Sequence, residues 1–181
     1  MSTSTQIQEI YIGLLGRAAD AEGLAYWKNE IDAGTLTIEQ LRANIVELQP
    51  EWQSGLGLLP RAELVDALYL SMFNREPDAA GKEYWVSGGG KDINADQLVL
   101  ALKNGASADD ATILANRADV ANYYTTANGS ADKTAAAAAL EGVGKDFSTV
   151  AAAKDMVDVT VTGGTVVEMV SGADAITGTA G

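Results

Sequence analysis

Residues Tyr11–Trp27 read YIGLLGRAADAEGLAYW, and residues Tyr69–Trp85, 58 positions later, read YLSMFNREPDAAGKEYW. Tyr, Arg, Asp, Gly, Tyr and Trp recur at the same offset in both stretches. Identities at a fixed spacing indicate an internal duplication, in which each copy forms one supersecondary unit. The sequence therefore predicts two tandem units, over about residues 7–50 and 65–105.

The residues around the first copy indicate helices. Residues 5–15 place apolar side chains such as Ile7, Ile10 and Leu14 on one face at helical spacing. Gly16 suits the end of that helix, and residues 37–48 repeat the apolar pattern with Thr37 as a cap. We expect the second copy to follow the same scheme, with helices over residues 64–73 and 95–102.

The repeated polar residues have a structural interpretation. An Asp before a helix caps it by accepting backbone N–H groups. An Arg three residues earlier can pair with that Asp across the turn, and a Gly three residues into the helix permits close helix contact. A ligand-binding role for the Arg and Asp is the less favoured alternative. The residues concerned are Arg17, Asp20, Gly23, Arg75, Asp78 and Gly81.

The rest of the chain predicts more helices and then a change of period. Helices are expected over residues 108–124, 131–141 and 146–156. From Val157 onward β-branched residues alternate with polar ones, and Gly163-Gly164 interrupts them, which is typical of a strand–turn–strand segment. The predicted fold is mainly α: a helical bundle over residues 1–156, with extra helices at 108–156 and a short β-hairpin or β-roll start at 157–181.

Composition excludes several functions. The 181 residues contain no cysteine and no histidine, which removes disulfides, thiolate sites and the usual general base near neutral pH. The net charge of −13 would repel nucleic acid and anionic lipid. No apolar run approaches the ~20 residues of a membrane span, so we expect neither membrane insertion nor nucleic-acid binding. A glycosidase with two carboxylates stays possible in principle, but no pair stands out, and we expect no enzyme.

The motif LGRxxDxxGxxYW, which starts at Leu15, resembles the helical domain of unknown function DUF4214. That resemblance covers about residues 7–105 and is carried by both copies, although the second has Phe73-Asn74 in place of Leu15-Gly16. The opening YxxxLGRxxD is also distantly similar to phycobilisome linker domains. The resemblance to DUF4214 implies a secreted bacterial surface protein, because such domains often stand beside RTX calcium-binding repeats.

The C-terminal residues add to this resemblance. Gly172-Ala-Asp174-Ala-Ile176 looks like half of an RTX nonapeptide, in which Asp and carbonyl oxygens hold calcium. Asp174 is therefore the candidate metal ligand, and calcium the candidate cofactor. RTX proteins leave the cell by type I secretion with a C-terminal signal, which agrees with an N-terminus lacking a Sec signal peptide. In RTX S-layer proteins, a helical N-terminal domain fixes the lattice to lipopolysaccharide.

Aromatic residues are the candidate glycan contacts. The Tyr-Trp pairs of the two units could stack on sugars, but core anchoring is the favoured interpretation, with one member of each pair buried and the other peripheral. Trp52 lies in a polar, glycine-bearing stretch and is the better candidate for an exposed contact, although packing back on the domain is about as plausible. The candidate glycan-binding residues are Trp52, Trp27, Trp85, Tyr123 and Tyr124.

We therefore expect a non-catalytic, structural domain of a secreted S-layer or other bacterial cell-surface protein, located outside the cell and anchored by binding surface polysaccharide such as the lipopolysaccharide O-antigen. The alternative is a cell-adhesion or lattice-forming module that binds another protein or associates with copies of itself.

Overall fold

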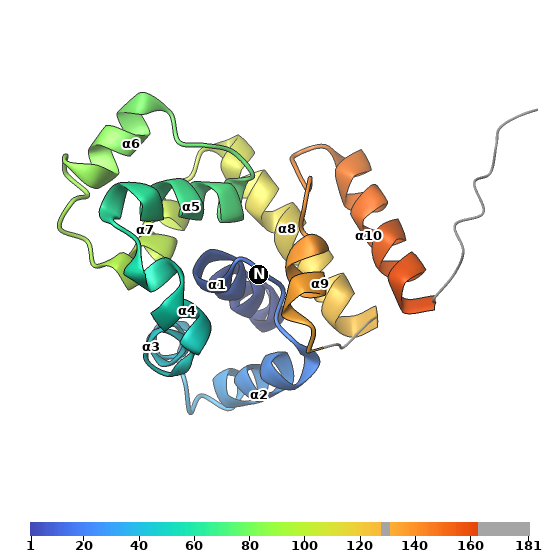
Figure 1. The fold of residues 1–181 in the computed structure, drawn as a ribbon. Coiled ribbons are helices and arrows are strands. Elements are labelled where there is room, and N and C mark those ends of the chain that lie inside the picture. Colours follow the sequence, from blue (N-terminus) through green and yellow to red (C-terminus); the bar gives the residue numbers. More distant parts are fainter. Residues whose placement is uncertain (128–130, 163–181) are drawn as a thin grey trace, which may run out of the picture.

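A computed structural model describes residues 1–127 and 131–162 of the chain. Within these residues the fold is helical, as predicted, and no strand is present. The α-helices are α1 Thr3–Leu15, α2 Ala21–Asp32, α3 Ile38–Leu48, α4 Pro50–Ser54, α5 Arg61–Phe73, α6 Ala79–Val86, α7 Leu98–Asn104, α8 Ala108–Ala127, α9 Lys133–Ala138 and α10 Phe147–Thr162, with short 3-10 helices η1 Leu56–Leu58 and η2 Ala95–Gln97 (Figure 1).

The duplication appears as two successive sets of helices, α1–α2–α3 and α5–α6–α7. Local signals fix their ends. Gly16 ends α1 with a φ of 66°, and Asn74 ends α5 with a φ of 52°, so both copies use the left-handed conformation that Gly and Asn tolerate best. Thr37 and Gln40 form a capping box at the start of α3, which confirms Thr37 as its cap.

Helix α1 lies at the centre of the bundle (Figure 1) and packs against α2, α3, α5 and α8. Every residue from Ile7 to Leu14 is buried, including the polar Gln8 and Glu9. The apolar pattern predicted one buried face. The polar residues are covered too, because Gln8 binds Thr125 on α8 and Glu9 binds Lys103 on α7.

Buried hydrogen bonds join this central helix and the turn after it to the C-terminal part of the fold. The Gln8 amide donates to Thr125 Oγ1 on α8 (2.9 Å) and accepts from the Ala19 backbone N–H (2.9 Å). The Ala18 N–H donates to the carbonyl of Ala136 on α9 (3.1 Å). Since buried polar groups need partners, α8 and α9 are required to complete the first unit.

The prediction of a strand from Val157 is wrong over residues 157–162, which form the last part of α10. Val150, Ala153 and Val157 recur at helical spacing and are buried in the core to which α8 contributes. That periodicity outweighs the β-branched alternation, since propensity yields to tertiary packing. Residues 163–181, the rest of the predicted β segment, lie outside the described residues.

Candidate functional site

The repeated residues of the first unit form one compact cluster at the turn between α1 and α2. Trp27 Nε1 donates to the hydroxyl of Tyr11 (3.0 Å), and the guanidinium of Arg17 lies 5.4 Å from the centre of the Tyr11 ring. Asp20 caps α2 by accepting from the Gly23 N–H at 2.8 Å. A Cβ on Gly23 would come within 2.9 Å of the Tyr11 hydroxyl, so this position requires glycine for the close approach.

The second unit repeats the main contacts of this cluster. Trp85 Nε1 donates to the hydroxyl of Tyr69 (3.2 Å), Arg75 lies 5.1 Å from the Tyr69 ring centre, and Asp78 accepts from the Gly81 N–H (2.8 Å). Both Asp residues are N-caps, as predicted. The repeated tyrosine, tryptophan and glycine fix how each second helix crosses the first.

The expected Arg–Asp pairs are not the main contacts of the arginines. Arg17 is 3.8 Å from Asp20, but it forms two hydrogen bonds, of 2.8 and 2.9 Å, with Glu51 on α4. Arg75 likewise binds both oxygens of Asp110 on α8, at 2.8 and 2.7 Å. A planar guanidinium binds a carboxylate best through two parallel bonds, which a capping Asp three residues away cannot offer while it holds the helix N-terminus.

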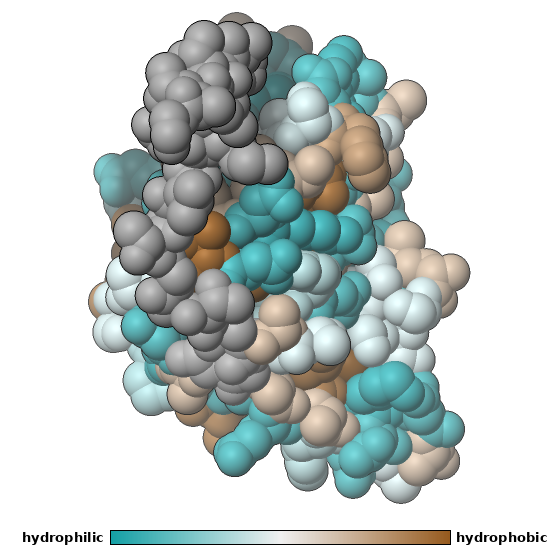
Figure 2. All heavy atoms as spheres, turned by 90° about the vertical axis from the view of Figure 1, so that its right-hand side faces the viewer, coloured by the Kyte–Doolittle hydropathy of each residue, from teal (hydrophilic) through white to brown (hydrophobic). Residues whose placement is uncertain are grey.

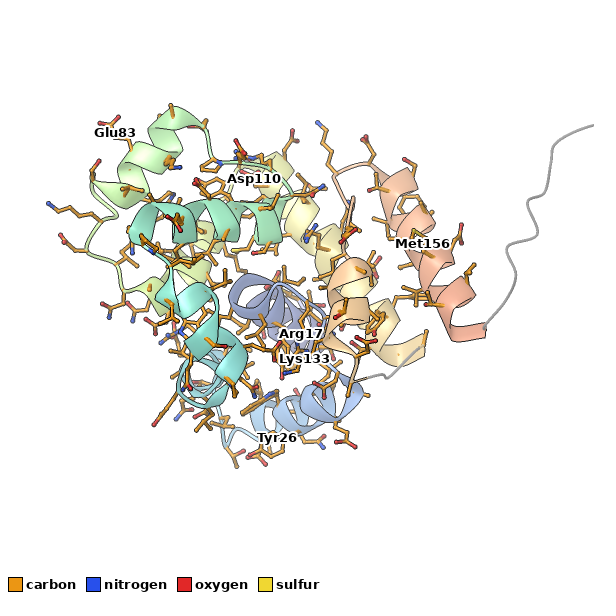
Figure 3. All side chains as sticks on the ribbon, in the orientation of Figure 1. Arg17, Tyr26, Glu83, Asp110, Lys133 and Met156 are labelled. Carbon is orange, nitrogen blue, oxygen red and sulfur yellow. The ribbon has the colours of Figure 1, made fainter. Side chains whose placement is uncertain are left out.

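The paired arginines lower the pKa values of both acids. The hydrogen bonds from Arg17 hold the pKa of Glu51 below its ordinary value, and Lys133 at 2.6 Å acts in the same direction; Arg17 and Lys133 lie close together in Figure 3. The hydrogen bonds from Arg75 lower the pKa of Asp110 in the same way. Both acids are therefore ionised near neutral pH and occupied by structural contacts, which does not suit them to act as general acids.

The Tyr-Trp pairs divide as predicted, with one member turned inward and one outward. Trp85 is 9% exposed, and Trp27 is partly buried against the core. The preceding tyrosines are exposed, Tyr26 by 56% and Tyr84 by 49%. Each exposed ring packs edge-on against its tryptophan with ring centres 4.8 Å apart, and Tyr26 lies at the outer side of α2 (Figure 3).

The other candidate glycan contacts lie elsewhere. Trp52 is only 5% exposed, so of its two interpretations packing back on the domain is confirmed and exposed contact is wrong. The residues around it form α4 and η1, which fold it into the core. Tyr124 is 1% exposed. Neither ring offers a face on which a sugar could stack. Tyr123 is partly exposed on α8, where its hydroxyl donates to Asp158 (2.6 Å) and its ring faces Lys154.

An apolar groove lies between α9 and α10, next to Tyr124 of α8. Its volume is about 100 Å³, and nearby on α10 Met156 is 68% exposed and Val159 37% exposed. Figure 2 views the molecule from this side, where apolar residues reach the surface between polar ones. The lining residues are Tyr124, Ala135, Ala138, Ala139, Glu141, Ala153, Met156, Val157 and Thr160.

The predicted calcium ligand, Asp174, lies outside the described residues. Among residues 1–127 and 131–162, no group of three or more acidic side chains could hold a metal ion. In the same part of the chain, no helix has the length and apolarity needed to cross a membrane.

Sequence reasoning missed two residues of the clusters, Glu51 and Asp110. Their positions in the chain could have indicated them. Each acid lies 34 or 35 residues after its arginine, in the first turn of the helix that follows its unit, α4 for Glu51 and α8 for Asp110. Arg61, which holds the loop after α6, was also missed, because it lies outside the repeated motif.

Comparison with known proteins relates the first unit to a protein family. Neither the curated proteins nor the solved structures contain a match to this chain. Residues 1–49, which span α1 to α3, match the family described as Domain of unknown function (DUF4214).

Proposed function

We propose that this chain is a non-catalytic anchoring domain of a bacterial cell-surface protein, and that it binds surface polysaccharide such as lipopolysaccharide O-antigen. The observation that supports this proposal is the pair of exposed tyrosines, Tyr26 and Tyr84, at equivalent positions of the two units. A binding domain with two like contacts suits a ligand that is itself a repeat, since two linked contacts give more affinity than one.

The geometry around each tyrosine favours binding of a flat, partly apolar ligand. Each ring is supported edge-on by a tryptophan, which is itself hydrogen-bonded to a tyrosine on the preceding helix. A tyrosine held in place offers apolar area at a small loss of side-chain freedom. The apolar C–H face of a pyranose ring fits such a surface.

The negative charge of the domain favours neutral over anionic polysaccharides as ligands. With a net charge of −13, the domain repels phosphate-rich or uronic-acid-rich glycans unless cations screen the repulsion. We therefore propose neutral sugars as the contacted residues and calcium as a screening ion. The extracellular setting, with type I secretion and a neighbouring RTX region of an S-layer protein, rests on the resemblance of the helical motif and is part of the same proposal.

The test is retention of the isolated domain on immobilised smooth lipopolysaccharide, with rough lipopolysaccharide lacking O-antigen as the comparison, in calcium and in chelator. We expect retention on the smooth form, reduced by the double variant Tyr26→Ala/Tyr84→Ala. Leu48→Ala is the matched control, because Leu48 is 64% exposed and apolar but lies outside the aromatic pairs. No retention on the smooth form under either condition would refute polysaccharide anchoring.

A second candidate function is self-association in a surface lattice, favoured by the apolar groove between α9 and α10. Exposed apolar area of this kind gains free energy when a second molecule covers it. We would expect the mass measured by light scattering to rise with protein concentration, and Met156→Asp to suppress the rise. A constant monomer mass over the concentration series would exclude it.

A further inference from the structure

The two exposed tyrosines differ in the backbone that comes after each of them along the chain. After Tyr26, helix α2 continues to Asp32. After Tyr84, helix α6 ends at Val86, and a loop containing Gly88, Gly89 and Gly90 turns back on the same ring. The Gly90 N–H donates to the carbonyl of Tyr84 itself, at 3.0 Å. The second unit therefore surrounds its tyrosine with backbone that the first unit lacks.

The loop packs closely on the Tyr84 ring. A Cβ placed on Gly89 would lie 3.0 Å from Tyr84 Cε2, and one on Gly90 would lie 3.0 Å from Cε1 and 2.5 Å from Trp85 Cε3. The glycines thus approach the ring from its Cε1 and Cε2 sides, and a side chain at either position would force the ring or the loop to shift. Beside this loop Tyr84 is 49% exposed, so a ligand can reach its ring.

Arg61 on α5 holds this loop in place. Its guanidinium donates to the carbonyls of Trp85 (2.9 Å), Gly90 (2.6 Å) and Ile93 (2.5 Å). These three carbonyls span the whole loop, and the donors of one planar group fix them relative to one another. Burial away from water lowers the pKa of Arg61. The loop, and with it the Tyr84 ring, is tied to the core helix α5.

We propose that Tyr84 is the principal sugar-contact residue of this domain, that the glycine loop 88–90 positions its ring, and that Tyr26 is a weaker, secondary contact. This inference rests on the proposed polysaccharide binding and adds which of the two tyrosines contributes more to the affinity. The physical reason is preorganisation. A ring contacted by backbone on its Cε1 and Cε2 sides and by Trp85 loses less freedom when a pyranose stacks on it than a ring supported by a tryptophan alone.

The experiment measures the affinity of the full chain for smooth lipopolysaccharide by biolayer interferometry. Tyr84→Ala is expected to weaken binding about tenfold and Tyr26→Ala about threefold or less. Tyr84→Phe keeps the ring and is expected to stay within about twofold of the unmodified chain. Circular dichroism and the thermal midpoint of each variant establish that it is folded.

A glycine substitution tests the loop separately. Gly89→Ala places a methyl group against the Tyr84 ring and should weaken binding about threefold while leaving the fold intact, since a shift of a few tenths of an ångström relieves the contact. Gly144→Ala is the matched control, because a Cβ there meets nothing within 4 Å and its φ is ordinary.

The outcomes separate this inference from the proposed function. If the unmodified chain binds but Tyr26→Ala costs as much as Tyr84→Ala, the larger contribution of Tyr84 is refuted and polysaccharide binding stands. If Gly89→Ala behaves like Gly144→Ala, the loop has no positioning role. If Tyr84→Phe loses as much as Tyr84→Ala, the hydroxyl and not the ring makes the contact. If the unmodified chain does not bind, both proposals fail.

Discussion

The two arginine–carboxylate pairs have the same geometry but opposite burial, and this predicts opposite effects of mutation. In the first unit the arginine is the buried member: the side chain of Arg17 is 6% exposed and that of Glu51 23%. In the second unit the acid is buried: the side chain of Asp110 is 6% exposed and that of Arg75 38%. Removing one member leaves the other without its partner, so the more costly change in each pair removes the more exposed member.

The magnitude depends on the group left behind. An ionic group left buried without its partner costs about 3–5 kcal/mol, whereas an exposed one costs about 1 kcal/mol or less. Glu51→Gln strands Arg17, which keeps its bond to the Ala18 carbonyl and a distant Asp20; we expect a loss of roughly 3 kcal/mol. Arg17→Met leaves Glu51 paired with Lys133 and should cost about 1 kcal/mol.

The second unit should show the reverse order. Arg75→Met strands the buried Asp110, which keeps the Ser107 hydroxyl as a hydrogen-bond partner (2.8 Å), and should cost roughly 3 kcal/mol. Asp110→Asn leaves an arginine that water can solvate, and should cost about 1 kcal/mol.

Urea unfolding at pH 7, monitored by tryptophan fluorescence, measures all four variants. Lys28→Ala is the control, because both members of the Lys28–Asp32 pair are more than two-fifths exposed, so its loss should stay within about 0.5 kcal/mol. The reasoning fails if the arginine change is the more costly one in both pairs, or if the acid change is the more costly one in both.

Three further predictions concern the clusters and the buried charges. Gly23→Ala should destabilise the fold by roughly 1–2 kcal/mol because its Cβ would lie 2.9 Å from the Tyr11 hydroxyl, and Gly81→Ala should cost less because its closest approach is 3.2 Å. In a double-mutant cycle followed by thermal melts, Tyr11→Phe should relieve part of the Gly23→Ala cost. Strict additivity of the two changes would contradict the steric explanation. The Arg75 contact lowers the pKa of Asp110, so the stabilisation by ionised Asp110 is present above about pH 4 and is lost as the pH falls through the lowered pKa. In buffered urea titrations, Asp110→Asn should therefore flatten the pH dependence of the free energy of unfolding between about pH 5 and 3. An unchanged slope would refute this. Burial lowers the pKa of Arg117 to about 10, and its guanidinium donates to a neutral acceptor, the Leu140 carbonyl, at 2.9 Å. Arg117→Met should therefore change the free energy of unfolding by less than about 1 kcal/mol. A loss as large as that of Glu51→Gln in the same denaturation assay would show that the charge is needed.

Much of the fold could be predicted because its signals are local. The caps at Asp20, Thr37 and Asp78 and the left-handed helix end at Gly16 are each decided within a few residues. The duplicated tyrosine–tryptophan hydrogen bond was not predicted, since its members are 16 residues apart and meet only when the second helix of each unit packs on the first. At the helix ends, the residue types are enough to predict the local backbone geometry.

The candidate site was predicted less well, because exposure is a property of the assembled bundle. Trp52 lies in a polar stretch and is nevertheless buried, since α4 and η1 fold around it. The ring of Tyr84 is made distinctive by Arg61, 23 positions earlier in the chain, and nothing in the residues between them indicates that contact.

The amino-acid sequence by itself determined the helical class, the duplication and the chemistry of each turn, because hydrogen bonds at helix ends act over three or four residues. Tertiary structure alone decided which acid each arginine binds, that the polar residues Gln8 and Glu9 of α1 are buried, and that residues 157–162 continue a helix instead of starting a strand. Those outcomes depend on burial against α8 and α4, and burial is settled only when segments far apart in the chain come together.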